Sequence, residues 1–385
     1  MKIGVIGAGR LGICFALLCE AAGYDVLVSD IREDYVNDLN DRKIITNEPE
    51  VENLLRVAKN FRATTDNREV IRECDLIYTL VATPSLSDGS YDVSAVWNVI
   101  EDIKEENVGR KNFVVGCTTN PGDCETFKKQ LPSNINVFYN PEFIAQGSII
   151  NDLRTADMVL LGTDPFADNA NVVADIKKLY EKIQTTRAIV CTMSTTASEI
   201  TKIAINCFLT TKISYANMLG DVLHHSGCGD EVSAVLSAVG TDSRIGRKYL
   251  GYGFGYGGPC LPRDNRSFAA FAKKVGLEYN LGTVTDEINN QHATFLCDYY
   301  EKINSNKIPF YFDSITYKKG TDILTESQQY RLCIDLLNRG YTVYIRNDSR
   351  VTPQICGELI DKYGERVKFV DDKKYVIESM FVISL

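Results

Sequence analysis

The residue best suited to covalent chemistry in this chain of 385 residues is Cys260, which ends the glycine-rich segment GYGFGYGGPC. A thiolate can capture an aldehyde as a thiohemiacetal, and loss of a hydride from that adduct gives a thioester that water hydrolyses. Oxidation of a primary alcohol to a carboxylate needs two such hydride removals, and a thiol keeps the aldehyde from escaping between them. An isolated cysteine is more often an inert buried thiol. Gly257 and Gly258, however, would let a substrate approach Cys260 closely, which favours catalysis.

A second motif, Gly7-x-Gly9-x-x-Gly12, directly follows an apolar run and opens a helical pattern. Such glycines permit a tight turn and let a pyrophosphate approach the backbone at a helix N-terminus. Asp30 ends the next apolar run, where a carboxylate can bind the adenosine ribose hydroxyls and repels a 2′-phosphate. The pattern therefore predicts NAD, rather than NADP, as the cofactor.

Two threonines, Thr83 and Thr118, lie near the ends of two further apolar runs. In open parallel sheets, ligands bind at the carboxyl ends of the strands. We therefore expect both side chains to line the cofactor cleft, although either one taken singly is more typical of a cap or a turn.

The bulk composition argues against several classes of function. The formal net charge is −9 and the pI is about 5.1, which disfavours nucleic acid or an anionic membrane as a partner. No apolar stretch approaches the ~18 residues that span a bilayer. The twelve cysteines are scattered without a C-x-x-C pair, so we expect reduced thiols and no metal site. With no leader pattern after Met1, the expected location is the cytoplasm.

These residues need a scaffold, and short apolar runs that alternate with amphipathic stretches predict an α/β fold. The N-terminal part is expected to be a doubly wound, Rossmann-type parallel sheet, because its apolar runs are continuous and parallel strands are covered on both faces. Its expected strands are 2–7, 25–30, 76–84, 112–119, 136–143 and 157–162, with a helix at 10–23.

The rest of the chain divides into a helical part and a second α/β part. Residues 195–227 have helical periodicity over a length that can connect two domains and bury a face against a partner subunit. The last part has expected strands at 309–317, 341–348, 367–370 and 380–385, with a helix at 325–339. We therefore expect an NAD-binding domain at 1–193, a helical dimerisation region with the cysteine loop at 194–303, and a smaller Rossmann-like domain at 304–385.

The segment GGPCLPRD (257–264) resembles the catalytic loop of the UDP-glucose/GDP-mannose dehydrogenase family, which reads Gly-Gly-x-Cys-hydrophobic-x-Lys/Arg-Asp. Further motifs of that family occur in the same order over about residues 1–345: the N-terminal glycine motif, VATPS (81–85), NPEF (140–143) with Gly147, Glu199-x-x-Lys202-x-x-x-Asn206, GTDSRIG (240–246), Tyr317-Lys318 with Thr321-Asp322, and Glu326-Ser327. The resemblance implies an NAD-dependent, four-electron oxidation of a nucleotide sugar at C6.

The resemblance also implies roles for individual residues. Lys202 and Asn206 share a helix face and would stabilise oxyanions at the sugar C6 position. Asp264 and Thr118 would handle protons and position water. Glu142 would activate the water that hydrolyses the thioester.

Substrate binding is implied for Arg244, Tyr249, Gly257 and Lys318. The amides of the glycine loop and Lys318 would hold the nucleotide diphosphate, and the domain at 304–385 would bind the UDP part. Arg244 resembles an arginine that reaches the sugar site of the neighbouring subunit, so we expect a homodimer.

Five positions depart from the pattern of the family. Ala145 and Gln146 stand where members often have Arg-Glu, and one acid of a pair is therefore missing. Gly116 stands where many members have Lys, and Cys117 where Ser is common. Arg263 replaces the usual Lys, which keeps the charge but changes the hydrogen-bond geometry.

UDP-glucose is the expected substrate, because the loop reads GGPC rather than the GGHC that we associate with UDP-N-acetylhexosamine members. GDP-mannose and the UDP-N-acetylhexosamines remain alternatives. A two-electron dehydrogenase of the hydroxyacid type would keep the fold but would not need Cys260. The departures motivate a third hypothesis, a catalytically silent NAD-binding protein, whereas the presence of Cys260, Lys202, Asn206 and Asp264 argues against it.

Overall fold

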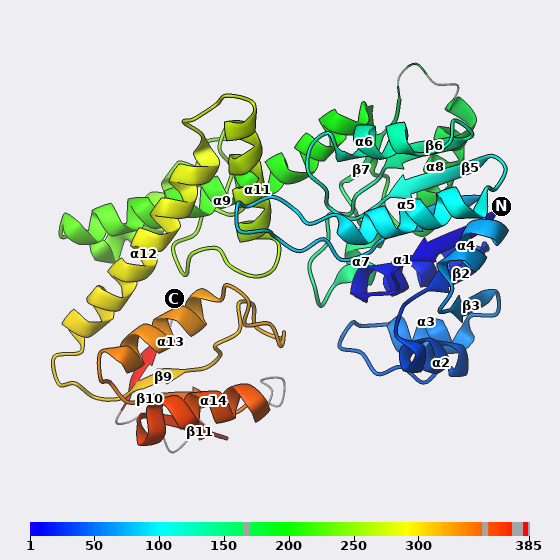
Figure 1. Ribbon diagram of the computed structural model, residues 1–385. Helices are drawn as coiled ribbons and strands as arrows, with labels where there is room; N and C mark the ends of the chain where they lie inside the picture. Colours follow the sequence, from blue (N-terminus) through cyan, green and yellow to red (C-terminus); the bar gives the residue numbers. More distant parts are fainter. Residues whose placement is uncertain (165, 167–168, 349–352, 372–379, 384–385) are drawn as a thin grey trace. The chain divides into compact units, whose positions relative to one another are not determined.

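The computed structural model describes residues 1–164, 166, 169–348, 353–371 and 380–383 (Figure 1). The chain forms two compact units, Met1–Lys202 and Ile203–Leu385. Each unit has its own sheet. The division into three domains at 193 and 303 stays a prediction.

The first unit is built on an eight-stranded sheet with the strand order β3-β2-β1-β4-β5-β6-β7-β8. Strands β1 to β6 are all parallel and have the doubly wound order of a dinucleotide-binding fold, which confirms the predicted fold class. Strand β7 runs antiparallel to β6, which corrects the expectation that it continues the parallel arrangement. The strands are β1 Lys2–Ile6, β2 Asp25–Ser29, β3 Phe61–Thr64, β4 Leu76–Thr79, β5 Lys111–Val115, β6 Ile135–Tyr139, β7 Met158–Gly162 and β8 Ile189–Met193.

Helices cover both faces of this sheet and give it two hydrophobic cores. Along β1, Ile3 and Val5 point into one core and Ile6 into the other, so a buried strand reads as a continuous apolar run. The helices of the unit are α1 Arg10–Ala21, α2 Glu33–Asp41, α3 Val51–Val57, α4 Asn67–Glu73, α5 Ser94–Glu106, α6 Asp123–Gln130, α7 Ile149–Arg154 and α8 Ala170–Ile183.

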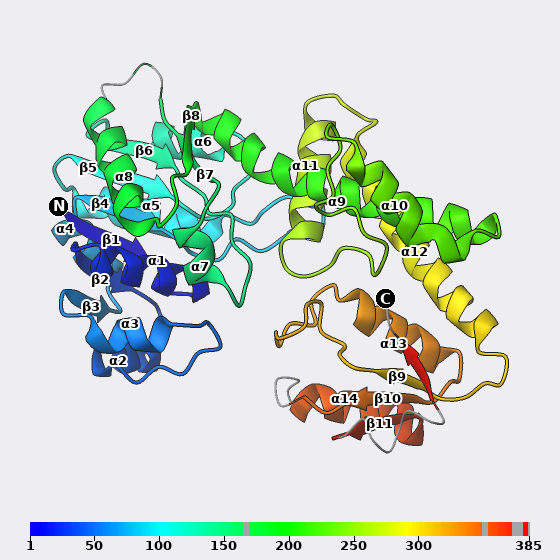
Figure 2. The same ribbon diagram turned by 180° about the vertical axis from the view of Figure 1, so that it is seen from behind.

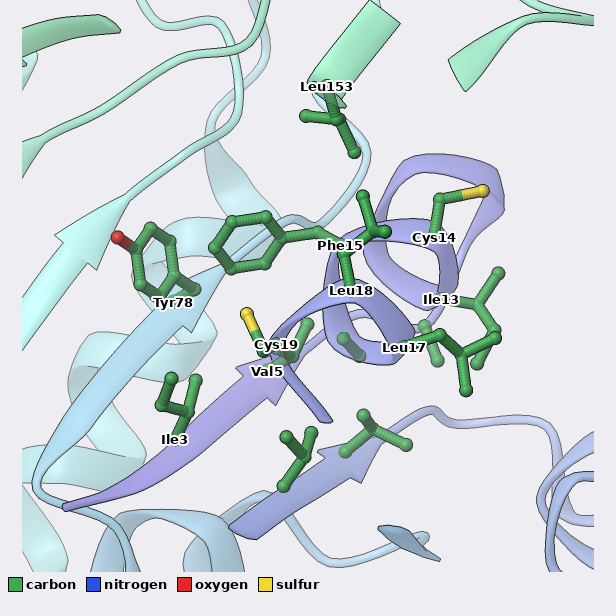
Figure 3. Close-up of a cluster of buried hydrophobic side chains, with 14 of the residues drawn as sticks. Ile3, Val5, Ile13, Cys14, Phe15, Leu17, Leu18, Cys19, Tyr78 and Leu153 are labelled. Atoms are coloured by element: carbon green, nitrogen blue, oxygen red, sulfur yellow. The ribbon is translucent and has the colours of Figure 1, made fainter. Parts of the chain in front are cut away.

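Helix α1 is the best-buried helix of this unit, with every residue from Gly12 to Cys19 inside the core. Figure 3 shows Phe15 of α1 pointing toward Tyr78 of β4, and the two ring centroids are 4.6 Å apart. Burial of a side chain such as Phe15 stabilises the fold by roughly 1.5–3 kcal/mol. The packing fixes the position of the helix N-terminus, where the glycine motif lies.

The second unit contains most of the long helix α9, Thr195–His225, and a four-stranded parallel sheet of order β11-β10-β9-β12. This order matches β3-β2-β1-β4 of the first sheet. Helices α12, α13 and α14 share one core with these strands, and Figure 2 shows α13 and α14 beside the sheet. The remaining elements are η1 Gly229–Glu231, α10 Val232–Thr241, α11 Leu261–Lys274, α12 Leu281–Ile303, β9 Phe310–Phe312, α13 Gln328–Asn338, β10 Val343–Arg346, α14 Pro353–Tyr363, η2 Gly364–Arg366, β11 Val367–Val370 and β12 Phe381–Ile383.

The predicted long helix at 195–227 and the strand at 367–370 are confirmed. The strand expected at 309–317 is shorter, because only residues 310–312 pair with β10 and β12. Of the strand expected at 380–385, residues 381–383 pair with β9, and residues 384–385 lie outside the described residues.

Candidate active site

The glycine motif forms a cradle at the N-terminus of α1. Gly7 has a φ of 95°, and a Cβ atom on Gly12 would lie 1.9 Å from the Gly7 carbonyl oxygen, so both positions need glycine. A Cβ atom on Gly9, in contrast, would have no protein atom within 4 Å. Gly9 caps α1 without a side-chain hydrogen bond. The space and the first amides of α1 therefore fit a pyrophosphate.

This difference between Gly9 and Gly12 can be tested with two alanine variants. Gly12→Ala should lower the free energy of unfolding by about 3 kcal/mol, because its Cβ atom meets backbone that cannot move freely. Gly9→Ala should fold normally but bind NAD on the order of tenfold more weakly, because its Cβ atom enters the pyrophosphate space. Thermal unfolding and NAD titration measure the two effects. Equal NAD affinity in Gly9→Ala and wild type would contradict this assignment of the space.

Asp30 directly follows β2 and is nearly buried. It accepts hydrogen bonds from the Arg32 guanidinium at 2.8 and 3.0 Å and from the Arg32 backbone amide at 3.1 Å. Burial alone would raise its pKa, but the hydrogen bonds and the charge of Arg32, with the Ala8 amide, lower the pKa overall. Asp30 is thus a carboxylate at neutral pH, as the predicted contact with ribose hydroxyls requires.

A cavity of about 320 Å³ adjoins the cradle and Arg32, the hydrogen-bond partner of Asp30. It is lined by Gly9, Arg10, Ile13, Arg32, Tyr35 and Glu48, among others. The Arg32 guanidinium lies 4.1 Å from the centre of the Tyr35 ring, which holds it in place. The residues present fit the adenosine half of NAD.

The two threonines predicted for the cofactor cleft lie next to each other. The Thr83 hydroxyl donates a hydrogen bond to the Thr118 carbonyl oxygen at 2.7 Å. Thr83 is buried and Thr118 is half-buried. This contact fixes the loop after β4 to the loop after β5.

Glu199 on α9 also holds the loop after β5, although sequence reasoning gave this residue no role. Its fully buried carboxylate accepts hydrogen bonds from the Thr119 hydroxyl at 2.9 Å and from the amides of Gly122 at 2.7 Å and Cys124 at 2.9 Å. Burial raises its pKa to about 7, against the opposite effect of these hydrogen bonds. Glu199 stands three residues before Lys202 and therefore on the same helix face, and this spacing is the sequence feature that could have identified it.

Glu142 and Lys202 meet at the end of β6. The Lys202 ammonium donates a hydrogen bond to the Glu142 carbonyl oxygen at 2.6 Å and lies 4.4 Å from the centre of the Phe143 ring. Burial raises the pKa of the Glu142 carboxyl to about 7, while a hydrogen bond with Tyr180 and the charge of Lys202 lower it. A carboxyl that titrates near neutral pH is suited to act as a general base.

Beneath Glu142 lies a buried polar network that the sequence analysis missed. The Tyr78 hydroxyl donates to the Asn140 side-chain oxygen at 3.1 Å, and the Tyr180 hydroxyl oxygen lies 2.9 Å from the same oxygen. The Asn140 amide donates to the Leu160 carbonyl oxygen at 3.0 Å. Tyr180 also contacts the Glu142 carboxyl. Asn140 was part of the quoted NPEF motif, whereas Tyr180 has no local sequence signal.

Three of the residues that depart from the family pattern, Ala145, Gln146 and Gly116, make specific contacts in this unit. Gln146 accepts a hydrogen bond from Arg10 at 3.0 Å, and the Ala145 amide donates to Asp152 at 2.8 Å. A Cβ atom on Gly116 would lie 2.6 Å from a terminal methyl of Leu80, so Leu80 fills the space that a longer side chain at 116 would take.

In the second unit, Cys260 is the N-cap residue of α11 and is partly exposed. The Asp264 amide closes the first helical turn on the Cys260 carbonyl oxygen at 2.9 Å. The buried Asp264 carboxylate accepts a hydrogen bond from the Asn206 amide at 2.6 Å, and Arg263 lies 3.6 Å from it. The structure therefore brings Cys260, Asn206 and Asp264 together.

The glycines before Cys260 are required by the packing of the loop. A Cβ atom on Gly257 would lie 2.3 Å from the Glu326 carbonyl oxygen. A Cβ atom on Gly258, whose φ is 81°, would lie 2.4 Å from the Tyr317 ring. These glycines let the cysteine loop pack against the segment 317–327, and the expected approach of a substrate at Gly257 stays a prediction.

The other predicted substrate residues lie at the surface of the second unit. The Arg244 side chain is 87% exposed and pairs with Asp242 at 2.6 Å. Tyr249 is half exposed and has a φ of 61°, and Lys318 is exposed. The remaining predicted site residues, which are Thr118, Glu142, Lys202 and the cofactor-binding residues, all belong to the first unit.

Within the part of the chain that the structure describes, no helix is both long and apolar enough to cross a membrane. Among these same described residues, no group of three His, Cys, Asp or Glu side chains is arranged to hold a metal ion.

Comparison with known proteins gives consistent results. Residues 1–184 match the NAD-binding domain, and residues 196–291 the central domain, of the UDP-glucose/GDP-mannose dehydrogenase family. A putative UDP-glucose 6-dehydrogenase of Bacillus subtilis is 27% identical over 98% of this chain and 88% of its own length. A UDP-glucose 6-dehydrogenase of Haloferax volcanii is 29% identical over 89% of this chain and 82% of its own length.

The fold of this chain is also similar to that of several proteins of known structure. A UDP-glucose dehydrogenase from Pyrobaculum islandicum has a TM-score of 0.85 and 25% identity, and the match covers 98% of this chain and 88% of that protein. A UDP-D-ManNAc dehydrogenase from Pyrococcus horikoshii has a TM-score of 0.76 at 22% identity, over 90% and 83% of the two chains, and shows the fold alone.

Proposed function

Because this chain belongs to the UDP-glucose/GDP-mannose dehydrogenase family of NAD-dependent oxidoreductases, we propose that it oxidises UDP-glucose to UDP-glucuronate. The observation that best supports this function is the position of Cys260 at the N-terminus of α11, beside the hydrogen-bonded pair of Asn206 and Asp264. A helix N-terminus favours negative charge and hence a thiolate nucleophile.

The chain's own residues account for the chemistry between the two oxidations. NAD, when bound, accepts a hydride in each of the two rounds. The Cys260 sulfur forms a bond to the aldehyde carbon, and the aldehyde oxygen takes up a proton to give a thiohemiacetal. Loss of a hydride from that carbon and of the hydroxyl proton gives a thioester. Water, deprotonated by Glu142, then attacks the thioester carbon, and Cys260 leaves as a thiolate.

Charge develops on the C6 oxygen in these steps. Lys202 and Asn206 lie four residues apart on α9 and supply an ammonium and an amide donor. The hydrogen bond from Asn206 to Asp264 uses one of the two amide hydrogens. Thr118 and Asp264 handle protons and position water in this proposal.

The nucleotide part is assigned to the glycine loop and the domain at 304–385, with contributions from Tyr249, Gly257 and Lys318. Arg244 is assigned to the sugar site of a partner subunit, and its exposed side chain leaves it accessible for that contact. The proposed location of the enzyme is the cytoplasm.

The reaction is tested by the amount of NADH formed per sugar, with purified protein, NAD and a panel of UDP- and GDP-sugars. Two NADH per UDP-glucose would support the proposal. Two NADH with GDP-mannose or a UDP-N-acetylhexosamine would keep the chemistry and change the substrate. One NADH per sugar would instead indicate a two-electron dehydrogenase, and no NADH with any sugar a protein without this activity.

We further propose that α9 forms a homodimer interface. The exposed apolar residues of this helix follow one another at spacings of seven, three and four residues, which places them on one face: Phe208, Tyr215, Met218 and Val222.

The double variant Met218→Glu/Val222→Glu should dissociate the dimer, because two charges would be buried at the interface. The dimer dissociation constant should rise by at least about a hundredfold, which analytical ultracentrifugation of the 43.0 kDa chain can measure. Val57→Glu, which also places a charge at an exposed apolar position, on α3, serves as the control. A monomeric wild type at micromolar concentration would refute the interface.

A further inference from the structure

His292 of α12 is a buried histidine that contacts the cysteine loop. It is 1% exposed. Its Nδ1 atom lies 2.8 Å from a carboxylate oxygen of Asp221 on α9, and its Nε2 atom lies 2.7 Å from the Gly253 carbonyl oxygen. Gly253 belongs to the loop 251–260, which ends at Cys260.

Both ring nitrogens of His292 therefore face oxygen atoms that accept hydrogen bonds. A neutral imidazole has one N–H donor and one acceptor nitrogen, whereas an imidazolium has two donors. A neutral ring beside an ionised Asp221 would leave one of the two contacts without a hydrogen. Two short contacts thus require one more proton on the His292–Asp221 pair than a neutral histidine supplies.

We propose that His292 is an imidazolium that donates to the Asp221 carboxylate and to the Gly253 carbonyl oxygen, and thereby positions the loop that carries Cys260. The pair is not a catalytic group, because it acts through the backbone of the loop. The consequence for catalysis rests on the proposed function of Cys260, but the protonation of the pair does not.

The loop has several other anchors that hold the same segment. The Gly253 amide donates to the Asn217 side-chain oxygen at 3.0 Å, and the Tyr252 hydroxyl donates to Asp221 at 3.0 Å. Further along the loop, Tyr256 and the Asn289 side chain exchange two hydrogen bonds, at 3.0 and 3.1 Å. Among these anchors, the histidine pair is the one whose side-chain type can change charge near neutral pH.

The surroundings of the pair determine how it responds to pH. Burial and the charge of Asp221 raise the pKa of Tyr252, so this hydroxyl remains a donor to Asp221. The His224 ring of α9 packs against the Tyr252 ring, and Tyr299 of α12 packs against His224. The adjoining cavity of about 710 Å³ is lined by the pair itself and by further titratable side chains, His224, His225, Asp298, Tyr299 and Lys302.

The direction of the effect follows from the proton count. At low pH, where the pair holds its proton, both contacts of His292 are made and Gly253 is held. As pH rises and the pair loses the proton, one of the two contacts loses its hydrogen. The loop should therefore be anchored at lower pH and released at higher pH.

The first test is the ¹⁵N NMR spectrum of the histidine side chains in the full chain. With only three histidines, His224→Gln and His225→Gln variants assign His292 by elimination, without changing the buried residue. At pH 7.5 we expect both ring nitrogens of His292 to be protonated, because each of them faces an acceptor oxygen. A neutral tautomer would overturn the proposal.

The second test compares Asp221→Asn with His292→Gln. In Asp221→Asn, the new side-chain amide N–H can donate to Nδ1, so a neutral His292 keeps its Nε2–H for Gly253, and the Tyr252 hydroxyl still has an oxygen acceptor. Asp221→Asn should therefore abolish the pH dependence of loop anchoring. His292→Gln cannot make both contacts, and it should loosen the loop roughly tenfold at every pH.

Hydrogen exchange of the amides at 251–258 measures the anchoring, after correction for the intrinsic pH dependence of exchange. Wild type should show extra opening as pH rises, and Asp221→Asn should not. Parallel pH profiles of the two proteins would overturn the proposal. Exchange and NMR do not require turnover, so an inactive protein in the NADH assay would refute the proposed function and leave this inference open to its own test.

Discussion

Replacement of Cys260 by serine should reduce the formation of uronate by about a thousandfold or more, a typical effect of removing a covalent nucleophile. A serine hydroxyl is far less nucleophilic than a thiolate at neutral pH, because it remains almost fully protonated. The position of residue 260 at the N-terminus of α11 favours an anion there. A thiol ionises far more readily than a serine hydroxyl, so only the thiol benefits from this position.

The measurement is steady-state NADH production with saturating NAD and UDP-glucose, together with product analysis for aldehyde and acid. Cys228→Ser is the matched control, because Cys228 is an exposed cysteine of the same unit and lies outside the proposed site. It should retain wild-type turnover. Equal uronate formation by Cys260→Ser and wild type would eliminate the thioester mechanism and favour a dehydrogenase that does not use the thiol.

Much of the fold follows from local sequence pattern. The buried strands β1, β2, β4, β5 and β6 are runs of apolar residues between polar turns, and a strand covered on both faces must have such a sequence. The edge strands β3 (Phe61–Thr64) and β8 (Ile189–Met193) were missed. β3 alternates apolar with polar residues over only four positions, and none of the five residues of β8 is buried, so both strand patterns are weak.

The direction of β7 could not be predicted from its sequence. DMVLLG is a typical buried strand, and nothing in its composition distinguishes a parallel from an antiparallel neighbour. Only the short connection from Asn140 to Asp157, with the single short helix α7, brings the chain back beside β6 in the opposite direction.

The site shows the same division between local and long-range information. The glycine cradle is local, and sequence spacing predicted it. Glu199 bonds to residues 75 to 80 positions away, and His292 to a residue 71 positions away. Such pairs depend on how helices dock, which a single sequence without an alignment does not encode in its local pattern.

Glu142→Gln should separate the oxidations from the hydrolysis. The amide can still receive a hydrogen bond from Tyr180, and Lys202 still bonds the backbone carbonyl of residue 142, so the local structure should persist. The two oxidations do not need the Glu142 carboxylate in the proposed mechanism, whereas hydrolysis does. We expect a burst of two NADH per active site, followed by turnover reduced by about 10²–10⁴-fold, the range for loss of a general base.

The pH dependence gives this prediction a second, independent readout. Burial raises the pKa of Glu142 to about 7, so below pH 7 the carboxyl is mostly protonated and cannot accept a proton from water. Hydrolysis in wild type should rise as pH increases through about 7, and Glu142→Gln should lack this rise. Glu287→Gln, at an exposed position on α12, should keep both the wild-type rate and the pH profile.

The same raised pKa has a consequence for stability, and its sign can be worked out. The folded state holds the Glu142 proton more tightly than the unfolded state, where the value is about 4.5. The stability that the protonated form contributes is complete below pH 4.5 and is lost as pH rises through about 7. Because glutamine remains neutral, Glu142→Gln should gain stability relative to wild type above pH 7 and not at pH 4. A burst without this gain would leave the catalytic role of Glu142 but contradict its burial as the cause of the raised pKa.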